Sequence, residues 1–107
     1  MEQLLRNIER DDSGLLRDPR DWTPELAQEL ALEDGIDKLS EVHWTFINSL
    51  RSYYAEFHVP PPSVRICHSM HLERDCVQDL FPNCLEAWRI AGLPDPGEEA
   101  KSYLSAE

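Results

Sequence analysis

The apolar residues of the chain recur at helical spacing over most of its length. The clearest case lies between positions 39 and 60, where they follow the three-and-four rhythm of one buried helix face. These residues are Phe46, Ile47, Leu50, Tyr54 and Phe57. Ser40 can cap the first N–H groups of such a helix. The prolines at positions 60–62 end it, because proline lacks the N–H that a helix interior needs. The pattern predicts one long helix.

An earlier segment predicts another helix. Thr23 can cap its start, Pro24 suits the first helical position, and Gly35 can end it in the left-handed conformation. Its apolar stripe consists of Leu26, Ala27, Leu30 and Ala31. A stripe of this kind buries one helix face against neighbouring elements.

Three shorter helices are predicted after the prolines. They cover Ser63 to His71, Glu73 to Phe81 and Asn83 to Ala91. Asn83 can cap the last of them and Gly92 can end it. Together with the two helices above, they make a mainly α fold of about five helices.

The two ends of the chain give weaker signals. Residues 1–12 fit a short helix slightly better than a strand. The run DDSG at positions 11–14 is a strong turn signal, and a small β-hairpin at this point is consistent with it. The acidic residues 95–107 predict a flexible tail with at most a frayed helical turn.

The length of 107 residues fits a single domain that spans residues 1–107. No apolar run approaches the roughly 20 residues that cross a bilayer, so no membrane partner is expected. The first ten residues are charged throughout and lack the apolar region of a secretion signal, which predicts a cytoplasmic protein. The three cysteines are an odd number, which rules out a full disulfide framework and makes reduced thiols the simpler expectation.

The charge balance restricts the class of partner. The chain has 21 acidic and 10 basic residues, so its surface repels the phosphate backbone of nucleic acid and suits a basic protein partner. The helices on either side of the prolines can be compared with a helix-turn-helix, but the second offers only Arg65 and histidines to DNA. A DNA-binding regulator is therefore the weakest of the functional hypotheses.

Polar and aromatic residues around the long helix stand at a recognisable spacing. They are His43, Trp44, Ile47, Leu50, Arg51, Tyr53, Tyr54, Phe57, Pro61, Val64 and Arg65, followed by a second set at positions 80–82, 90–94 and 96. Over about residues 13–96 this pattern resembles the DsrC/TusE family of sulfur-relay proteins. The resemblance implies a small orthogonal bundle of about five helices with a short N-terminal β-hairpin. It also implies partners of the sulfurtransferase or sulfite-reductase type, and no cofactor is expected.

The cysteines that carry sulfur in such proteins have no counterpart at the matching positions. The relatives have a penultimate cysteine on a flexible C-terminal arm, and some have a second cysteine shortly before Ala-Gly-Leu-Pro. Here the second position is Trp88, the first falls near Glu98 or Glu99, and the residue before the last is Ala106. Sulfur carriage requires a thiolate. The resemblance therefore predicts a non-catalytic, partner-binding or regulatory protein of sulfur metabolism, and not an enzyme.

Cys84 is the best candidate for a reactive thiol. It stands at a predicted helix N-terminus, where the helix dipole lowers the pKa of a thiol, and it shares a helix face with Trp88. A persulfide carrier that uses Cys84 is the alternative hypothesis. The competing interpretation is a core residue, because free cysteine is among the most buried residue types. Cys67 and Cys76 fit the core better still.

A metal site is not predicted. Cys67, His71, Cys76 and Cys84 could supply four zinc ligands. The chain has no C-x-x-C pair, however, and the spacings match no common zinc motif.

Three residues are candidates for partner binding. Arg51 and Arg65 are basic residues in an acidic chain, and Tyr53 is expected to point outward. All three stand at positions that match the family. His43 has no identifiable nucleophile as its partner, so we expect it to cap or pack rather than to act as a general base.

Overall fold

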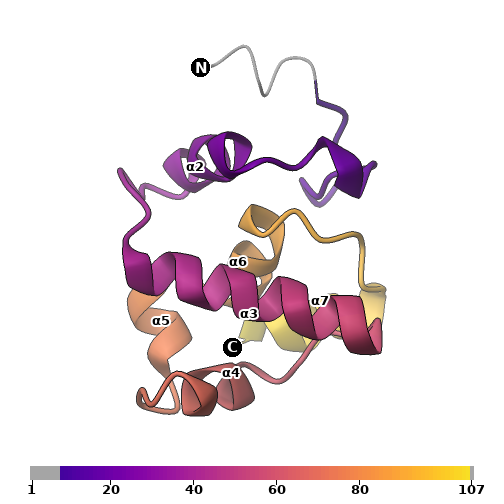
Figure 1. Cartoon of the computed structure of the whole chain (residues 1–107). Helices are drawn as coiled ribbons and strands as arrows, with labels where there is room; N and C mark the ends of the chain where they lie inside the picture. The colour runs from indigo at the N-terminus through magenta and orange to yellow at the C-terminus, as the bar shows by residue number, and fades with distance from the viewer. Residues whose placement is uncertain (1–7, 107) are drawn as a thin grey trace.

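The computed structural model describes residues 8–106, so part of the segment predicted as a short helix or strand lies outside the described residues. Its elements are the 3-10 helix η1 (Pro19–Asp21) and the helices α2 (Pro24–Glu33), α3 (Glu41–Phe57), α4 (Ser63–Ser69), α5 (Cys76–Leu80), α6 (Cys84–Ile90) and α7 (Glu98–Ala106). Figure 1 shows α2 above the long helix α3 and α4 below it. Within residues 8–106, no helix combines the length and the apolar character that crossing a bilayer requires.

Three predicted helix starts are confirmed by their caps. Thr23, Ser40 and Asn83 each accept a hydrogen bond from the backbone N–H three residues further on. At the start of α3 the bond is returned, because Nδ1 of His43 accepts from the Ser40 N–H at 3.1 Å and closes a capping box. Nε2 of His43 lies 2.9 Å from the Leu80 carbonyl oxygen. His43 therefore both caps α3 and ties it to α5, which confirms the structural role predicted for it.

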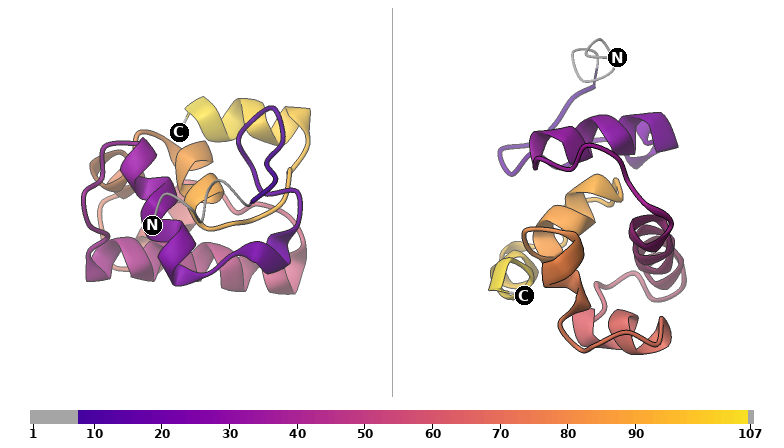
Figure 2. Two further views of the ribbon diagram at one scale, coloured as in Figure 1. Left: turned by 90° about the horizontal axis from the view of Figure 1, so that it is seen from above. Right: turned by 90° about the vertical axis from the view of Figure 1, so that its left-hand side faces the viewer.

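The short helix α6 lies at the centre of the bundle. It contacts α2, α3, α5 and α7, and Figure 2 shows it between α2, α3 and α7. Its buried residues are Cys84, Ala87, Trp88, Arg89 and Ile90. A helix buried on most sides is a core element, so α6 provides the packing surface that the longer, amphipathic helices share.

The predicted N-terminal β-hairpin is wrong, because no strands form in the described part of the chain. A single isolated antiparallel bridge joins Arg10 and Leu16. Between them the Asp11 carboxylate accepts hydrogen bonds from the N–H groups of Ser13 and Leu15, at 2.8 and 3.0 Å. These local bonds satisfy donors that a strand ladder would otherwise use. The DDSG run is therefore a turn, as predicted, but the turn does not continue into a sheet.

The C-terminal residues form a packed helix, whereas the sequence predicts a flexible tail with at most a frayed turn. α7 lies against α6, with Ala100 and Leu104 buried. Lys101 forms ion pairs with Asp95 and Glu98 at 3.1 and 3.0 Å. The sequence signal for α7 was weak because its apolar face is only about one residue wide at each turn.

A disulfide between Cys67 and Cys76 joins α4 to α5. The expectation of reduced thiols is therefore wrong for these two residues. Both helices are shorter than predicted, because residues 70–75 form a reversing loop in which His71 adopts a left-handed φ of 61°. The reversal brings the two Cα atoms to 5.7 Å, a usual separation for a disulfide. Cysteine spacing alone could not show this reversal.

Candidate functional site

The turn after α6 carries the motif Ile90 to Pro94, and side chains from distant parts of the chain hold it. The indole N–H of Trp22 donates to the Ile90 carbonyl at 2.9 Å. The Arg51 guanidinium donates to the Ala91 carbonyl at 2.7 Å and also lies over the Trp22 ring, 3.9 Å from its centroid. These bonds satisfy carbonyl groups that have no partner inside the helix.

Gly92 in this turn has no room for a side chain. Its φ of 71° is a left-handed conformation that favours glycine, and a Cβ there would overlap the Trp22 ring. Close by, the fully buried Trp88 donates its indole N–H to the Pro94 carbonyl at 2.8 Å and meets Tyr54 edge to face. Two tryptophans therefore fix the point from which the chain leaves α6 toward α7.

Arg51, predicted as a partner-binding residue, lies within this arrangement. Burial lowers the pKa of its guanidinium. The same side chain lines an open cavity of about 380 Å³ together with Tyr54, Gly92 and Pro94. The structure thus gives Arg51 an internal role in holding the turn, and binding of a partner by Arg51 stays a prediction.

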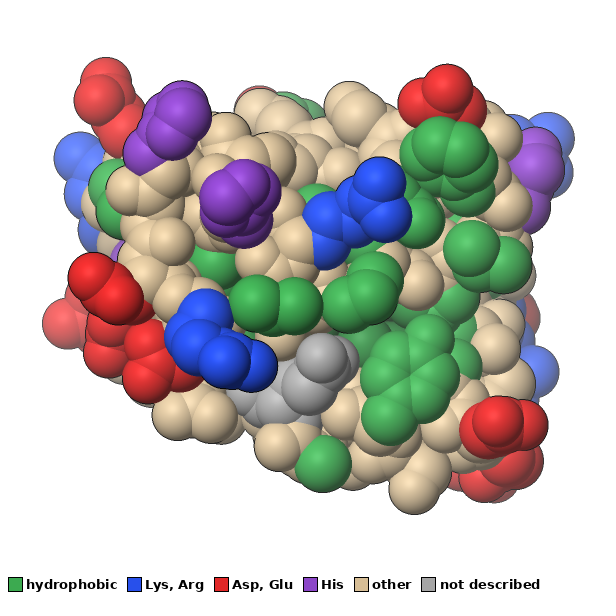
Figure 3. Space-filling model, turned by 90° about the horizontal axis from the view of Figure 1, so that it is seen from below, with side chains coloured by type: hydrophobic (Ala, Val, Ile, Leu, Met, Phe, Trp, Pro, Cys, Tyr) green, Lys and Arg blue, Asp and Glu red, His purple; other side chains and the backbone are tan. Residues whose placement is uncertain are grey.

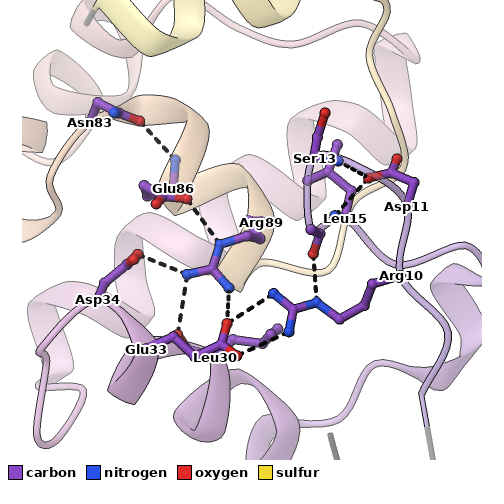
Figure 4. Close-up of polar contacts among 11 residues, drawn as sticks. Arg10, Asp11, Ser13, Leu15, Leu30, Glu33, Asp34, Asn83, Glu86 and Arg89 are labelled. Carbon is purple, nitrogen blue, oxygen red and sulfur yellow. Dashed lines mark hydrogen bonds and ion pairs between the residues drawn. The ribbon is translucent and has the colours of Figure 1, made fainter.

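Arg89, from α6, is the charged centre of the core (Figure 4). Its guanidinium forms ion pairs with Glu33 at 2.7 Å, Asp34 at 3.0 Å and Glu86 at 2.9 Å. It also approaches the Leu30 carbonyl oxygen to 3.3 Å. A buried cation of this kind is tolerated because several acceptors replace the water that it loses.

The pKa values of the acidic groups around Arg89 shift in opposite directions. A hydrogen bond from Arg10, 2.9 Å away, is the largest cause of the lowered pKa of Glu33. Burial raises the pKa of Asp34. Burial also opposes the charge on Arg89, but the hydrogen bond to Glu86 and the attraction of Asp34 outweigh it and raise the pKa of Arg89. This network ties the end of α2 and the N-terminal segment to the central helix.

Tyr53 and Arg65 lie together in a groove between α3 and α4, here called the α3–α4 groove. The Arg65 guanidinium lies 5.7 Å from the centroid of the Tyr53 ring, within the range of a cation–π interaction. Tyr53 also packs on Phe57, with ring centroids 4.6 Å apart. The groove has a volume of about 280 Å³ and is lined by Ser49, Ser52, Tyr53, Glu56, Phe57, Arg65, Ile66 and Ser69. The structure therefore brings together two of the three predicted partner-binding residues and places Arg51 in a separate cavity.

The face of the molecule below α4 differs from its generally acidic surface. Figure 3 shows apolar and basic side chains next to one another in the middle of this face, with acidic side chains at its margins. Among the exposed apolar residues of α3, α4 and the segment between them are Phe57, Val59 and Val64. Exposed apolar surface of this kind is typical of interaction sites.

Cys84 is fully buried at the first position of α6 and lies outside the disulfide. A reactive thiol needs access to its reaction partner as well as a favourable pKa. The structure favours the core interpretation, and a reactive Cys84 stays a prediction. In the described part of the chain, no three His, Cys, Asp or Glu residues are placed to hold a metal ion.

A family model described as "DsrC like protein" matches residues 4–98, which include α3, the α3–α4 groove and the Ile90–Pro94 turn. The chain belongs to this DsrC-like family. The resemblance found in the sequence is thereby confirmed.

Curated and solved relatives agree with this assignment. The chain is 33% identical over 104 residues to a protein of Buchnera aphidicola named "Sulfurtransferase TusE", covering 89% of this chain and 90% of the relative. A crystal structure of the oxidized gamma-subunit of the dissimilatory sulfite reductase (DsrC) from Archaeoglobus fulgidus is 32% identical, with a TM-score of 0.72, over 85% of this chain and 90% of the other. The solution structure of DsrC from Pyrobaculum aerophilum is 30% identical, with a TM-score of 0.74, over 85% of both chains.

Within this DsrC-like chain, the two parts of the sequence signature have different structural roles. Arg51, Tyr54 and the Ile90–Pro94 motif meet inside the molecule around the turn after α6. Tyr53 and Arg65 meet at its surface. The signature therefore specifies both the contacts that hold the turn after α6 and a separate surface groove between α3 and α4.

Proposed function

We propose that this DsrC-like chain is a cytoplasmic partner-binding protein of sulfur relay, which docks on a sulfurtransferase or sulfite-reductase-type protein through the α3–α4 groove. The observation that carries the proposal is the pairing of Tyr53 with the exposed Arg65 beside exposed apolar residues. Aromatic and arginine side chains are the types that dominate binding energy in protein interfaces. The names of the relatives point to the two classes of partner.

We further propose that the C-terminal part of the chain does not carry sulfur and that the protein is not an enzyme. No cysteine occurs after Cys84. Trp88 fills the position that the resemblance assigns to a second cysteine, and its indole is buried and hydrogen-bonded to Pro94. Leu104 is buried in α7, so the segment after the turn supports the core. A protein that binds the partner but does not carry sulfur suits a regulatory role.

Substitution of the groove residues is expected to weaken partner binding. Tyr53→Ala and Arg65→Glu each remove one member of the central pair, and each is expected to raise the Kd for a sulfurtransferase partner about tenfold or more. Isothermal titration calorimetry with the purified partner measures this change. Arg20→Glu is the matched control, because it makes the same charge change on a side chain that is 90% exposed and remote from the groove.

The control variant is expected to bind like the wild type. If Arg20→Glu and Arg65→Glu weakened partner binding equally, the effect would be due to net charge. This result would contradict specific binding in the α3–α4 groove. Absence of binding between the wild-type chain and either class of partner would overturn the proposal itself.

Incubation of the prereduced chain with a small persulfide donor is expected to add no sulfur atom to Cys84, because this side chain is fully buried. Intact-mass spectrometry before and after incubation tests this expectation. A gain of one sulfur atom that is lost in Cys84→Ser would instead establish the alternative function, a persulfide carrier.

A further inference from the structure

The disulfide between Cys67 and Cys76 is asymmetric in its access to solvent. Cys67 is fully buried. Cys76 lines an open hollow of about 230 Å³, here called the Cys76 hollow. The other residues of the Cys76 hollow are Val42, Leu72, Glu73, Asp79 and Leu80. Cys76 is 4% exposed and Cys67 is 0% exposed, so the hollow offers an approach to the disulfide from the side of Cys76.

The lining of the Cys76 hollow restricts the kind of reductant that fits it. Val42 and Leu72 are exposed apolar side chains of this lining, at 42% and 41%. Glu73 and Asp79 add two carboxylates to the same lining. In a chain of net charge −11, these carboxylates repel small anionic thiols such as glutathione. An apolar protein surface that presents its thiol at the tip can instead cover Val42 and Leu72.

We propose that the Cys67–Cys76 pair is a redox site whose reductant is a protein dithiol of the Cys-x-x-Cys class that docks on the Cys76 hollow. The donor thiolate attacks Sγ of Cys76, forming an intermolecular disulfide, and Cys67 leaves as a thiolate that takes up a proton. The second donor thiol, as its thiolate, then attacks the donor sulfur in that mixed disulfide and releases Cys76. Two electrons pass in total: the donor dithiol becomes a disulfide, and the chain gains two thiols.

Reduction removes the covalent link between α4 and α5. α4 has seven residues and α5 has five, and helices this short have little stability on their own. The disulfide holds them across the loop of residues 70–75. Since α4 also contributes Arg65 to the α3–α4 groove, the redox site lies on the element that presents the proposed docking residue, although the redox proposal does not depend on that function.

The test uses the oxidised full-length chain and counts thiols by alkylation under denaturing conditions followed by intact-mass spectrometry. One alkylated cysteine is expected before reduction and three afterwards, since the chain has three cysteines and two of them form the disulfide. Thioredoxin, kept reduced by its reductase, is expected to act about tenfold faster than glutathione at the same thiol concentration, because the carboxylates slow the anionic thiol. Dithiothreitol, which is small and uncharged, serves as the reference reductant.

Variants separate docking from the reactivity of the disulfide itself. Leu72→Glu is expected to slow thioredoxin about tenfold and dithiothreitol much less, because the new carboxylate slows any thiolate but only thioredoxin also loses an apolar docking contact. The double variant Glu73→Gln/Asp79→Asn is expected to accelerate glutathione. Val64→Glu is the matched control, because Val64 is an exposed apolar residue that does not line the Cys76 hollow.

Three results would each overturn the proposal. They are equal rates with thioredoxin and glutathione, an equal effect of Leu72→Glu and Val64→Glu on thioredoxin, and three alkylated cysteines in the chain before any reductant is added.

Discussion

Replacement of Arg89 by methionine is expected to lower the free energy of unfolding by about 3–5 kcal/mol at neutral pH. Methionine is unbranched and uncharged, so it keeps the packing of the aliphatic part of the arginine side chain while the cation is lost. Glu33, Asp34 and Glu86 then face one another without the guanidinium that now lies within 3.0 Å of each. Urea unfolding followed by circular dichroism measures the difference.

The deficit of the Arg89→Met variant is expected to depend on pH. The pKa of Glu33 is lowered in the folded chain, with Arg10 as the largest cause and Arg89 contributing. The stability that Glu33 contributes is therefore present above the pKa of the unfolded chain and is lost as the pH falls through the lower pKa of the folded one. Asp34 acts in the opposite sense, because burial raises its pKa. Since protonation removes the unpaired charges, the difference between variant and wild type shrinks below about pH 4.

Arg20→Met is the matched control for this experiment. Arg20 pairs with Asp18 at 3.1 Å, but its side chain is 90% exposed, so water replaces the ion pair at little cost. Unfolding of this variant is expected to match the wild type at every pH. If Arg89→Met were as stable as this control, the buried network would contribute nothing to the fold.

Replacement of Gly92 by alanine is expected to lower the free energy of unfolding by about 3 kcal/mol. The left-handed backbone costs an alanine about 1–2 kcal/mol. The added Cβ must also displace the Trp22 ring, which breaks the bond from its indole N–H to Ile90 and its stacking with Arg51. Urea unfolding again gives the magnitude.

Gly35→Ala isolates the backbone contribution. Gly35 has a φ of 80°, close to that of Gly92, but a Cβ there would meet nothing within 4 Å. This variant is expected to lose about 1 kcal/mol. The difference between the two alanine variants measures the clash with Trp22. Equal losses at both positions would show that the ring accommodates the methyl group.

Capping residues in the sequence predicted correctly where three of the helices begin. Thr23, Ser40 and Asn83 act as the caps that were expected. Packing between distant segments decided the rest. α7 forms because Leu104 is buried in the folded bundle, and the isolated segment gives no sign of this. The N-terminal turn remains a turn because the side chain of Asp11 satisfies the backbone.

The candidate site also combines residues that the sequence indicates with residues that only the fold brings together. Tyr53 and Arg65 could be proposed from the sequence because they stand in a recognisable motif. The packing of α4 on α3 brings the two side chains together. Arg89 could not, because a single arginine in a short segment looks like a surface residue. Its surroundings offered one signal, the acidic pair Glu33-Asp34 together with Glu86 one turn before it. Only the fold shows that these three carboxylates converge on one cation.

The central position of α6 has a consequence for biosynthesis. Residues 84–90 leave the ribosome after α2, α3 and α5, although all three of these helices pack on them. The nascent chain can form local helical turns before that moment, but it has no closed interior to stabilise them. Closure of the bundle must therefore wait until α6 has emerged, and until then the nascent chain exposes the apolar faces of these helices to chaperones and proteases.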